Sequence, residues 1–265
     1  MQDISYFTAG DGARIAYRQD GGAGLPTLVL ANSIGTTLHM WDAQIPALTR
    51  HFRVLRYDYR GHGASSVPQG AYSLDRLGRD VLELLDGLGI ERAHFLGLSL
   101  GGIVGQWLGV HAPERVGRLI LSNTSAYLGP APQWDERIAA TERADDMSET
   151  AETFLKNWFP APWLREGNPA VEPFRAMLLS TDKHGLAGAF AAVRDFDLRP
   201  TIALIPNPTL VIAGQHDTVT AASHGEQIAA AIPGARLLVL PAVHLANIEL
   251  PQAFEAAIEE FLLEG

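Results

Sequence analysis

The stretch AHFLGLSLGG, residues 93–102, decides the fold of this chain. Its first four residues predict a short buried strand, and the small residues after Ser99 predict the start of a helix. Gly97 and Gly101 leave room where a strand and a helix meet closely at a sharp turn. The pattern G-x-S-x-G recurs by chance, but here it has the strand–turn–helix setting that a nucleophilic serine requires. The alternatives are a Gly-rich packing turn and a phosphate-binding turn.

Short apolar runs recur on both sides of this stretch, with helical patterns between them. Near-continuous apolar strands are typical of a parallel sheet that is covered on both faces, so we expect an α/β fold with a mostly parallel central sheet. A hairpin signal surrounds residues 10–12. The expected strands are residues 27–31, 52–57, 93–97, 116–121, 209–213 and 236–240. The expected helices are 74–88, capped by Ser73 and ended by Gly89, one after Ser99, and those near 222–232 and 252–263.

The alternation of strands and helices fails between residues 125 and 198, which carry several prolines and no convincing strand. We interpret residues 126–198 as a helical cap inserted into an α/β core made of residues 1–125 and 199–265. Three of the five tryptophans, Trp134, Trp158 and Trp163, lie in this insertion. They either contact a substrate or only attach the insertion to the core.

The composition of the chain excludes several kinds of site and partner. The 265 residues include no cysteine, which excludes disulfides, Cys-ligated zinc, iron–sulfur clusters and a thiol nucleophile. A net charge of −10 argues against nucleic acid and anionic membrane surfaces as partners. An anionic substrate would therefore need a cation in its pocket. Because no targeting segment or membrane span is visible, we expect a cytoplasmic protein, and the sequence gives no oligomeric state.

A nucleophilic serine needs a base, and the base needs a carboxylate that orients it. His244 follows the last expected strand, where sites form in parallel sheets, and is the best base. Asp217 follows the strand 209–213 and is the best acid. The alternative for His244 is a histidine in a surface loop with no catalytic role. The alternative for Asp217 is a side chain that caps an Asx turn. The other histidines after Ser99 are His184, His216 and His224. Two other acids were considered, Asp195 and Asp197. Both precede the strand 209–213 and would lie at its amino end, away from the expected site.

An oxyanion hole would take its first donor from the backbone N–H of Leu100, the residue after the serine. The second donor comes from the loop after the strand 27–31, and its position favours Ile34. Ordinary turn chemistry would also explain the sequence Asn-Ser-Ile-Gly of that loop.

The chain resembles the α/β-hydrolase family, and within it the 3-oxoadipate enol-lactonases. The turn DYRGHGAS, residues 58–65, is similar to the family pattern D-x-R-G-x-G-x-S. The segments that resemble the enol-lactonases are ANSIGT (31–36), MW (40–41), FRVLRYD (52–58), LSNT (121–124) and HLANIE (244–249). Leu100 departs from the methionine expected there, but it presents the same backbone N–H.

The resemblance implies an α/β-hydrolase fold and opening of a small anionic enol-lactone in the β-ketoadipate pathway of aromatic catabolism, without metal or cofactor. It leaves open which cation binds the substrate carboxylate. The candidates in the insertion are Arg137, Arg143, Lys156, Arg165, Arg175 and Lys183. Trp134 and Arg137 are three residues apart and would share a helix face, so we expect this pair to contact the substrate.

Fold and triad do not choose between related activities. A general carboxylesterase, a carbon–carbon bond hydrolase and a cofactor-free perhydrolase would use the same three side chains. A ligand receptor built on a hydrolase scaffold is the alternative from a different functional class.

Overall fold

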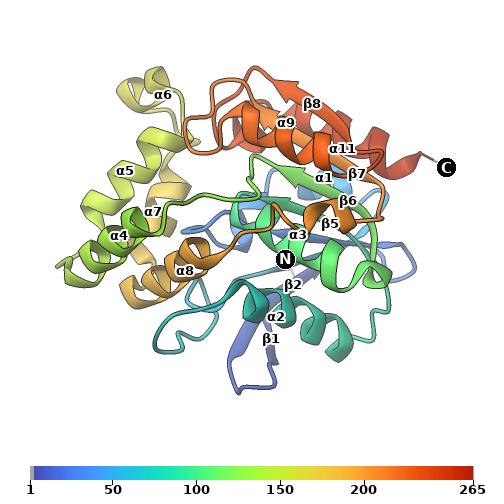
Figure 1. Cartoon of the computed structure of the whole chain (residues 1–265), viewed down its shortest axis with the longest axis horizontal. Coiled ribbons are helices and arrows are strands. Elements are labelled where there is room, and N and C mark those ends of the chain that lie inside the picture. The colour runs from blue at the N-terminus through green and yellow to red at the C-terminus, as the bar shows by residue number, and fades with distance from the viewer. Residues whose placement is uncertain (1–2, 265) are drawn as a thin grey trace.

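One eight-stranded sheet organises the computed structural model, which describes residues 3–264 (Figure 1). The strand order is β1-β2-β4-β3-β5-β6-β7-β8. The pairs β1–β2 and β2–β4 are antiparallel and all other pairs are parallel, which confirms the expected α/β class. The strands are β1 (Ser5–Thr8), β2 (Arg14–Asp20), β3 (Thr27–Ala31), β4 (Arg53–Tyr57), β5 (Ala93–Leu98), β6 (Val116–Ser122), β7 (Thr209–Gly214) and β8 (Arg236–Leu240).

The predicted N-terminal hairpin is present as β1 and β2, with Thr8 opposite Arg14. The sequence did not show that β2 also pairs with β4, where Tyr17 lies opposite Tyr57. The hairpin therefore extends one edge of the main sheet, because the backbone groups of β2 are paired on both sides.

Helices cover both faces of the sheet. The apolar core on one face includes Leu77 of α2, Val104 of α3 and Ile228 of α9. The core on the other face includes Leu48 of α1 and Phe254 of α11. These helices and their short neighbours are α1 (Ile45–Leu48), α2 (Leu74–Gly87), α3 (Leu100–His111), α9 (Ala222–Ala231), α10 (Ala246–Glu249), α11 (Pro251–Leu263), and the 3₁₀ helices η1 (Leu38–Trp41), η2 (Pro113–Arg115) and η3 (Ile202–Leu204).

Helix α2 has the ends that its sequence predicts. The Ser73 side chain accepts a hydrogen bond from the backbone N–H of Arg76 at 3.1 Å, which satisfies one of the free donors of the first turn. Gly89 follows the last turn with a φ of 64°, the left-handed conformation that ends many helices.

The chain leaves the sheet after β6 and returns before β7 through a series of helices. They lie together beside the core, at the left in Figure 1. The backbone N–H of Leu198 donates to the carbonyl of Ala126 at 2.9 Å, so the two ends of this helical excursion meet at one point. Its helices are α4 (Ala131–Arg143), α5 (Ser148–Trp158), α6 (Ala161–Glu166), α7 (Glu172–Ser180) and α8 (Lys183–Asp195).

Aromatic side chains connect the helices of the excursion. The buried Trp158 lies with its ring centroid 6.4 Å from that of Phe174, and Trp163 stacks on Phe159 at 6.1 Å. Both of these contacts join helices within the excursion, so they hold its parts together rather than attach it to the core. Trp134 lies 5.5 Å from Phe190 between α4 and α8, where it also lines a cavity.

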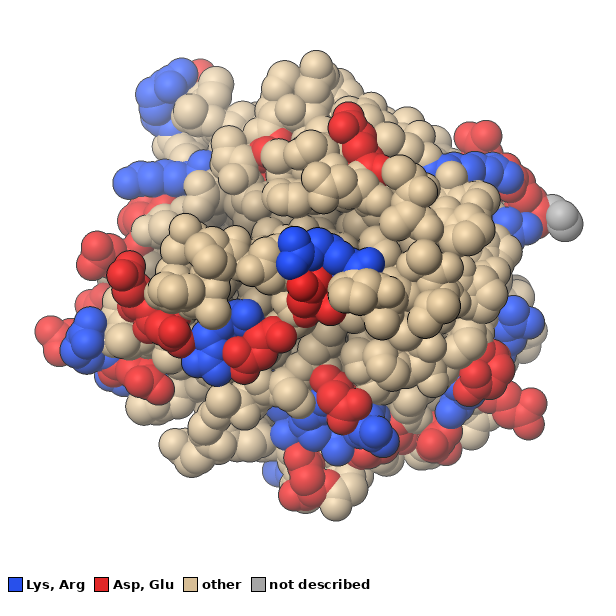
Figure 2. All heavy atoms as spheres, in the orientation of Figure 1, with Lys and Arg blue, Asp and Glu red and all other residues tan. Residues whose placement is uncertain are grey.

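No helix within residues 3–264 is long and apolar enough to cross a membrane. On the face drawn in Figure 2, basic side chains lie beside acidic ones rather than in a patch of one sign. Arg194, for example, forms ion pairs with Asp135 at 2.8 Å and with Asp195 at 2.7 Å.

Candidate active site

Ser99 occupies the sharp turn between β5 and α3. Its φ of 58° and ψ of −115° are values that residues other than glycine rarely adopt. A Cβ atom at Gly97 would lie 2.0 Å from the carbonyl oxygen of Gly101, so only glycine fits there. The turn is held by the Ser99 N–H, which donates to the Ser122 carbonyl at 2.9 Å, and by the Thr124 hydroxyl, which donates to the Ser99 carbonyl at 2.8 Å. Such strain costs about 1–3 kcal/mol and is typical of functional turns.

Asp217 and His244 meet beyond the carboxyl ends of β7 and β8. Nδ1 of His244 lies 2.8 Å from Oδ2 of Asp217. Asp217 also accepts hydrogen bonds from the backbone N–H groups of Val219 at 2.8 Å and Thr220 at 3.0 Å, and from the Thr220 hydroxyl at 2.9 Å. These donors fix the carboxylate, which in turn fixes the tautomer of His244 with its proton on Nδ1.

The Asp217 carboxylate is ionised throughout the ordinary pH range. Burial alone would raise its pKa, but the neighbouring His244 and the hydrogen bonds to the charged form outweigh burial and hold the pKa at about 2. A permanent negative charge beside His244 favours the imidazolium form that arises when a histidine accepts a proton.

Asn123 is a site residue that the sequence analysis did not single out individually. It follows β6 with a φ of 44°, and its side-chain amide donates to Oδ2 of Asp217 at 3.0 Å and to the Val243 carbonyl at 3.2 Å. The Ser122 hydroxyl donates to the Asn123 amide oxygen at 2.8 Å and orients it. The available signal was its place at the carboxyl end of a strand beside β7.

Ser99 and His244 line the same cavity. Nε2 of the buried His244 has no hydrogen-bond partner within residues 3–264 and is free to accept a proton. The competing acids lie elsewhere, since Asp195 pairs with Arg194 and Asp197 with Arg199 in exposed ion pairs. The competing histidines His184, His216 and His224 do not line this cavity.

Ile34 and Leu100 also line the cavity beside Ser99. Their backbone N–H groups have no acceptor in the described part of the chain, although most amides of a folded protein are paired. Two free donors next to a serine hydroxyl can bind a developing oxyanion, and each such donor contributes about 3–4 kcal/mol to a transition state.

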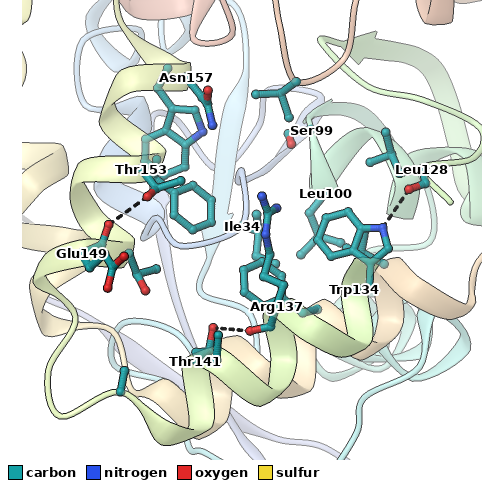
Figure 3. A pocket seen from close by; sticks show the side chains of 18 of the residues that line it. Ile34, Ser99, Leu100, Leu128, Trp134, Arg137, Thr141, Glu149, Thr153 and Asn157 are labelled. Atoms are coloured by element: carbon teal, nitrogen blue, oxygen red, sulfur yellow. Dashed lines mark hydrogen bonds between the residues drawn. The ribbon is translucent and has the colours of Figure 1, made fainter. Parts of the chain in front are cut away.

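The cavity has a volume of about 600 Å³ and lies between the sheet edge and the helices α4, α5 and α8. Figure 3 shows Arg137 extending from α4 into the cavity beside Trp134. The guanidinium carbon of Arg137 lies 5.0 Å from the ring centre of Trp134 and 5.6 Å from that of Phe190. The structure thus places the two residues expected in the cap on one face of α4.

Arg137 forms no ion pair with any residue described by the structure. Arg143 is the other cation among the lining residues, and it also forms no ion pair within residues 3–264. Arg137 differs from Arg143 in its contacts with the rings of Trp134 and Phe190. The remaining candidates do not line the cavity: Arg175 pairs with Glu152 and Glu172, and the Lys183 ammonium donates to the Ala144 carbonyl at 2.8 Å. Lys156 and Arg165 also lie outside the lining. No group of three or more His, Asp or Glu side chains in residues 3–264 is arranged to hold a metal ion.

His62 is a second buried residue that the sequence analysis did not single out. Its Nε2 accepts a hydrogen bond from the backbone N–H of Gly35 at 2.9 Å, and its Nδ1 lies 3.3 Å from the Arg60 carbonyl. Burial lowers the pKa of His62 from 6.5 to about 4 and outweighs the opposing effect of the Arg60 carbonyl.

The contribution of His62 to the free energy of unfolding is therefore expected to fall as the pH falls from 6.5 to 4. In this window the unfolded chain takes up a proton at His62 and the native protein does not, which costs about 3 kcal/mol in total. Urea unfolding of the wild-type protein and of His62→Gln between pH 7 and 4.5 measures this difference. The wild-type curve must be steeper than the variant's, and parallel curves would contradict the assignment.

Known proteins resemble this chain over most of its length. Residues 26–251 match the family model that is described as the α/β hydrolase fold. The chain belongs to the α/β hydrolase family. A hydrolase of known structure from Pseudomonas aeruginosa PA01 is 69% identical to it, with a TM-score of 0.98 and 99% of each chain covered.

Two curated relatives indicate the kind of bond that this α/β hydrolase cleaves. A 3-oxoadipate enol-lactonase from Acinetobacter baylyi is 41% identical over 92% of this chain and 91% of the relative. A relative from Agrobacterium fabrum, provisionally named a carbamate hydrolase, is 31% identical over 90% of this chain and 93% of the relative. The enol-lactonase relative and the shared fold identify this α/β hydrolase as a carboxylic ester hydrolase of the lactonase kind.

Proposed function

We propose that this α/β hydrolase opens the ring of 3-oxoadipate enol-lactone to give 3-oxoadipate, as a step of the β-ketoadipate pathway of aromatic catabolism. Ser99 is the nucleophile, His244 the base and Asp217 the acid that orients it. The backbone N–H groups of Leu100 and Ile34 form the oxyanion hole.

The single observation that carries the choice of substrate is the unpaired Arg137 in the cavity that holds Ser99. The substrate is a small lactone with one carboxylate, and the protein's net charge of −10 repels such an anion at long range. A guanidinium that has no carboxylate partner of its own binds a substrate carboxylate in the fork geometry that arginine favours. Trp134 supports the flat apolar side of the ring.

The first half of the reaction opens the ring. Nε2 of His244 takes the proton of the Ser99 hydroxyl while the Ser99 oxygen forms a bond to the lactone carbonyl carbon. The carbonyl oxygen becomes an oxyanion that the two free N–H groups bind. When the carbonyl forms again, the bond to the ring oxygen breaks, and that oxygen receives the proton from His244. The acyl-enzyme then carries an enol, which converts to the ketone and can no longer close the ring.

The second half releases the product. Nε2 of His244 takes a proton from water, whose oxygen forms a bond to the acyl carbon. The bond to the Ser99 oxygen then breaks, and Ser99 recovers its proton from His244. The product is a dicarboxylate, and one water molecule is consumed in each cycle.

The decisive assay follows the ultraviolet loss of freshly generated enol-lactone beside a panel of p-nitrophenyl esters. We expect kcat/KM for the lactone to exceed that for every simple ester in the panel. Strong ester hydrolysis with no lactone loss would make the protein a general carboxylesterase and would overturn the substrate assignment. Binding of the lactone with negligible turnover would instead favour a receptor.

Replacing Arg137 with methionine is expected to raise KM for the enol-lactone about 10- to 100-fold, because one charge-assisted hydrogen-bonded contact contributes about 1.5–3 kcal/mol. Hydrolysis of the neutral ester p-nitrophenyl acetate should stay within about twofold. Steady-state kinetics on both substrates measures the difference.

Two matched variants control this experiment. Arg143→Met removes the other cation that lines the cavity, and Arg194→Met removes a cation that is already paired with Asp135 and Asp195. Both should leave KM for the lactone nearly unchanged. If Arg143→Met raises KM while Arg137→Met does not, Arg143 rather than Arg137 binds the substrate carboxylate.

A further inference from the structure

Two side chains of the turn after β4 hold the loop that carries Ile34. His62 accepts the N–H of Gly35 at 2.9 Å, and the Asp58 carboxylate accepts the N–H of Leu38 at 2.6 Å. Both side chains are buried, at 1% exposure each. The loop is therefore attached to this turn at two points, one of them directly after Ile34, which lines the cavity.

The turn that carries His62 is itself rigid. Arg60 forms a bidentate ion pair with Asp80 at 2.6 and 2.7 Å and a second ion pair with Asp11 at 2.8 Å. The Ser65 N–H donates to the His62 carbonyl at 3.0 Å. A histidine on such a support holds its hydrogen-bond partner at a fixed place.

Gly35 has an unusual backbone conformation, and its N–H bonds to a side chain rather than to the backbone. Its φ is 76°, and a Cβ atom there would lie 2.9 Å from the Leu178 side chain. No backbone carbonyl among residues 3–264 accepts the Gly35 N–H, and Nε2 of His62 takes that role. The bond restrains the peptide plane between Ile34 and Gly35, which is the plane directly after Ile34, and so limits how far the backbone at Ile34 can turn.

We propose that His62 is a positioning residue that, through the Gly35 amide, aims the backbone N–H of Ile34 at the oxyanion. The inference rests on the proposed role of Ile34 in that hole. His62 touches neither substrate nor reacting atoms. Its contribution is to the geometry of one donor, and a displacement of about 1 Å in such a donor costs about 100-fold in rate.

The test compares His62→Leu, which removes the acceptor, with His62→Gln, whose amide oxygen reaches the position of Nε2. Both enol-lactone and p-nitrophenyl acetate are used, since every ester forms an oxyanion. We expect His62→Leu to lower kcat about 10- to 100-fold with KM within about twofold, and His62→Gln to recover most of kcat. If His62→Leu does not fold, His62→Asn is used in its place, because the asparagine side chain is too short to bring its oxygen to the Gly35 N–H.

His94→Leu is the matched control. His94 also accepts a backbone N–H, that of Arg118 at 3.0 Å, but it lies near the amino end of β5, away from Ser99. Its kcat should stay within about twofold of wild type. An equal fall in kcat for His94→Leu and His62→Leu would show a general loss of packing and overturn the inference.

The remaining outcomes are equally decisive. Unchanged kcat in His62→Leu, a change confined to KM, or no recovery in His62→Gln each overturns the positioning role. Wild-type protein that hydrolyses the acetate ester but not the lactone refutes the substrate assignment, and the acetate data still decide the role of His62.

Discussion

Replacement of Ser99 with alanine is expected to lower kcat for the enol-lactone by about 10⁴-fold or more while the protein stays folded. Removal of a serine nucleophile leaves only the rate acceleration that binding and the oxyanion hole provide. Ser99 is not part of the apolar core, and its backbone bonds to Ser122 and Thr124 do not involve its hydroxyl. The rate of lactone loss, measured at matched protein concentration, gives the result.

Ser99→Gly is the companion variant. It should be equally inactive but about 1 kcal/mol more stable than Ser99→Ala, because glycine adopts the φ of 58° without steric cost. A serine-reactive phosphonate should label the wild-type protein and neither variant. Turnover above about a tenth of the wild-type rate in Ser99→Ala would refute the proposed nucleophile.

Replacement of Asp217 with asparagine is expected to lower kcat about 10³- to 10⁴-fold. Oδ2 of Asp217 accepts hydrogen bonds from three side chains, those of His244, Asn123 and Thr220. An amide NH₂ at that position would face these donors, so His244 would turn or adopt the other tautomer. Its Nε2 would then no longer be a free acceptor. Pre-steady-state and steady-state rates on the lactone measure the loss.

Asp197→Asn is the control for this change, since it alters an acid whose ion pair with Arg199 is exposed. We expect its kcat to lie within about twofold of wild type. If Asp217→Asn retained kcat, another residue would have to orient His244, and the proposed roles at this sheet edge would be wrong.

The strands and the serine turn could be predicted because their causes are local. An apolar run, two glycines and a serine fix the turn at Ser99, and no distant residue is needed to recognise it. Asp217 and His244 were found from topology, because the carboxyl ends of parallel strands share one edge. The shared helix face of Trp134 and Arg137 could be predicted from their spacing of three residues.

Asn123 and His62 could not be assigned a role in the same way because their partners are distant in sequence. Asn123 contacts a carboxylate 94 positions later, and His62 contacts an amide 27 positions earlier. A single asparagine after a strand, or a histidine in a glycine-rich turn, has many ordinary explanations. Their significance is visible only when the sheet order places the segments together.

The hydrogen bond between Leu198 and Ala126 has a consequence for how enzymes of this shape diversify. An excursion that starts and ends at one point can change in length, sequence or helix number while the sheet beneath it keeps its register. Ser99, Asp217 and His244 lie outside the excursion, and Trp134 and Arg137 lie within it. With the roles proposed above, substitutions in the excursion change one wall of the substrate cavity and leave Ser99, Asp217 and His244 in place.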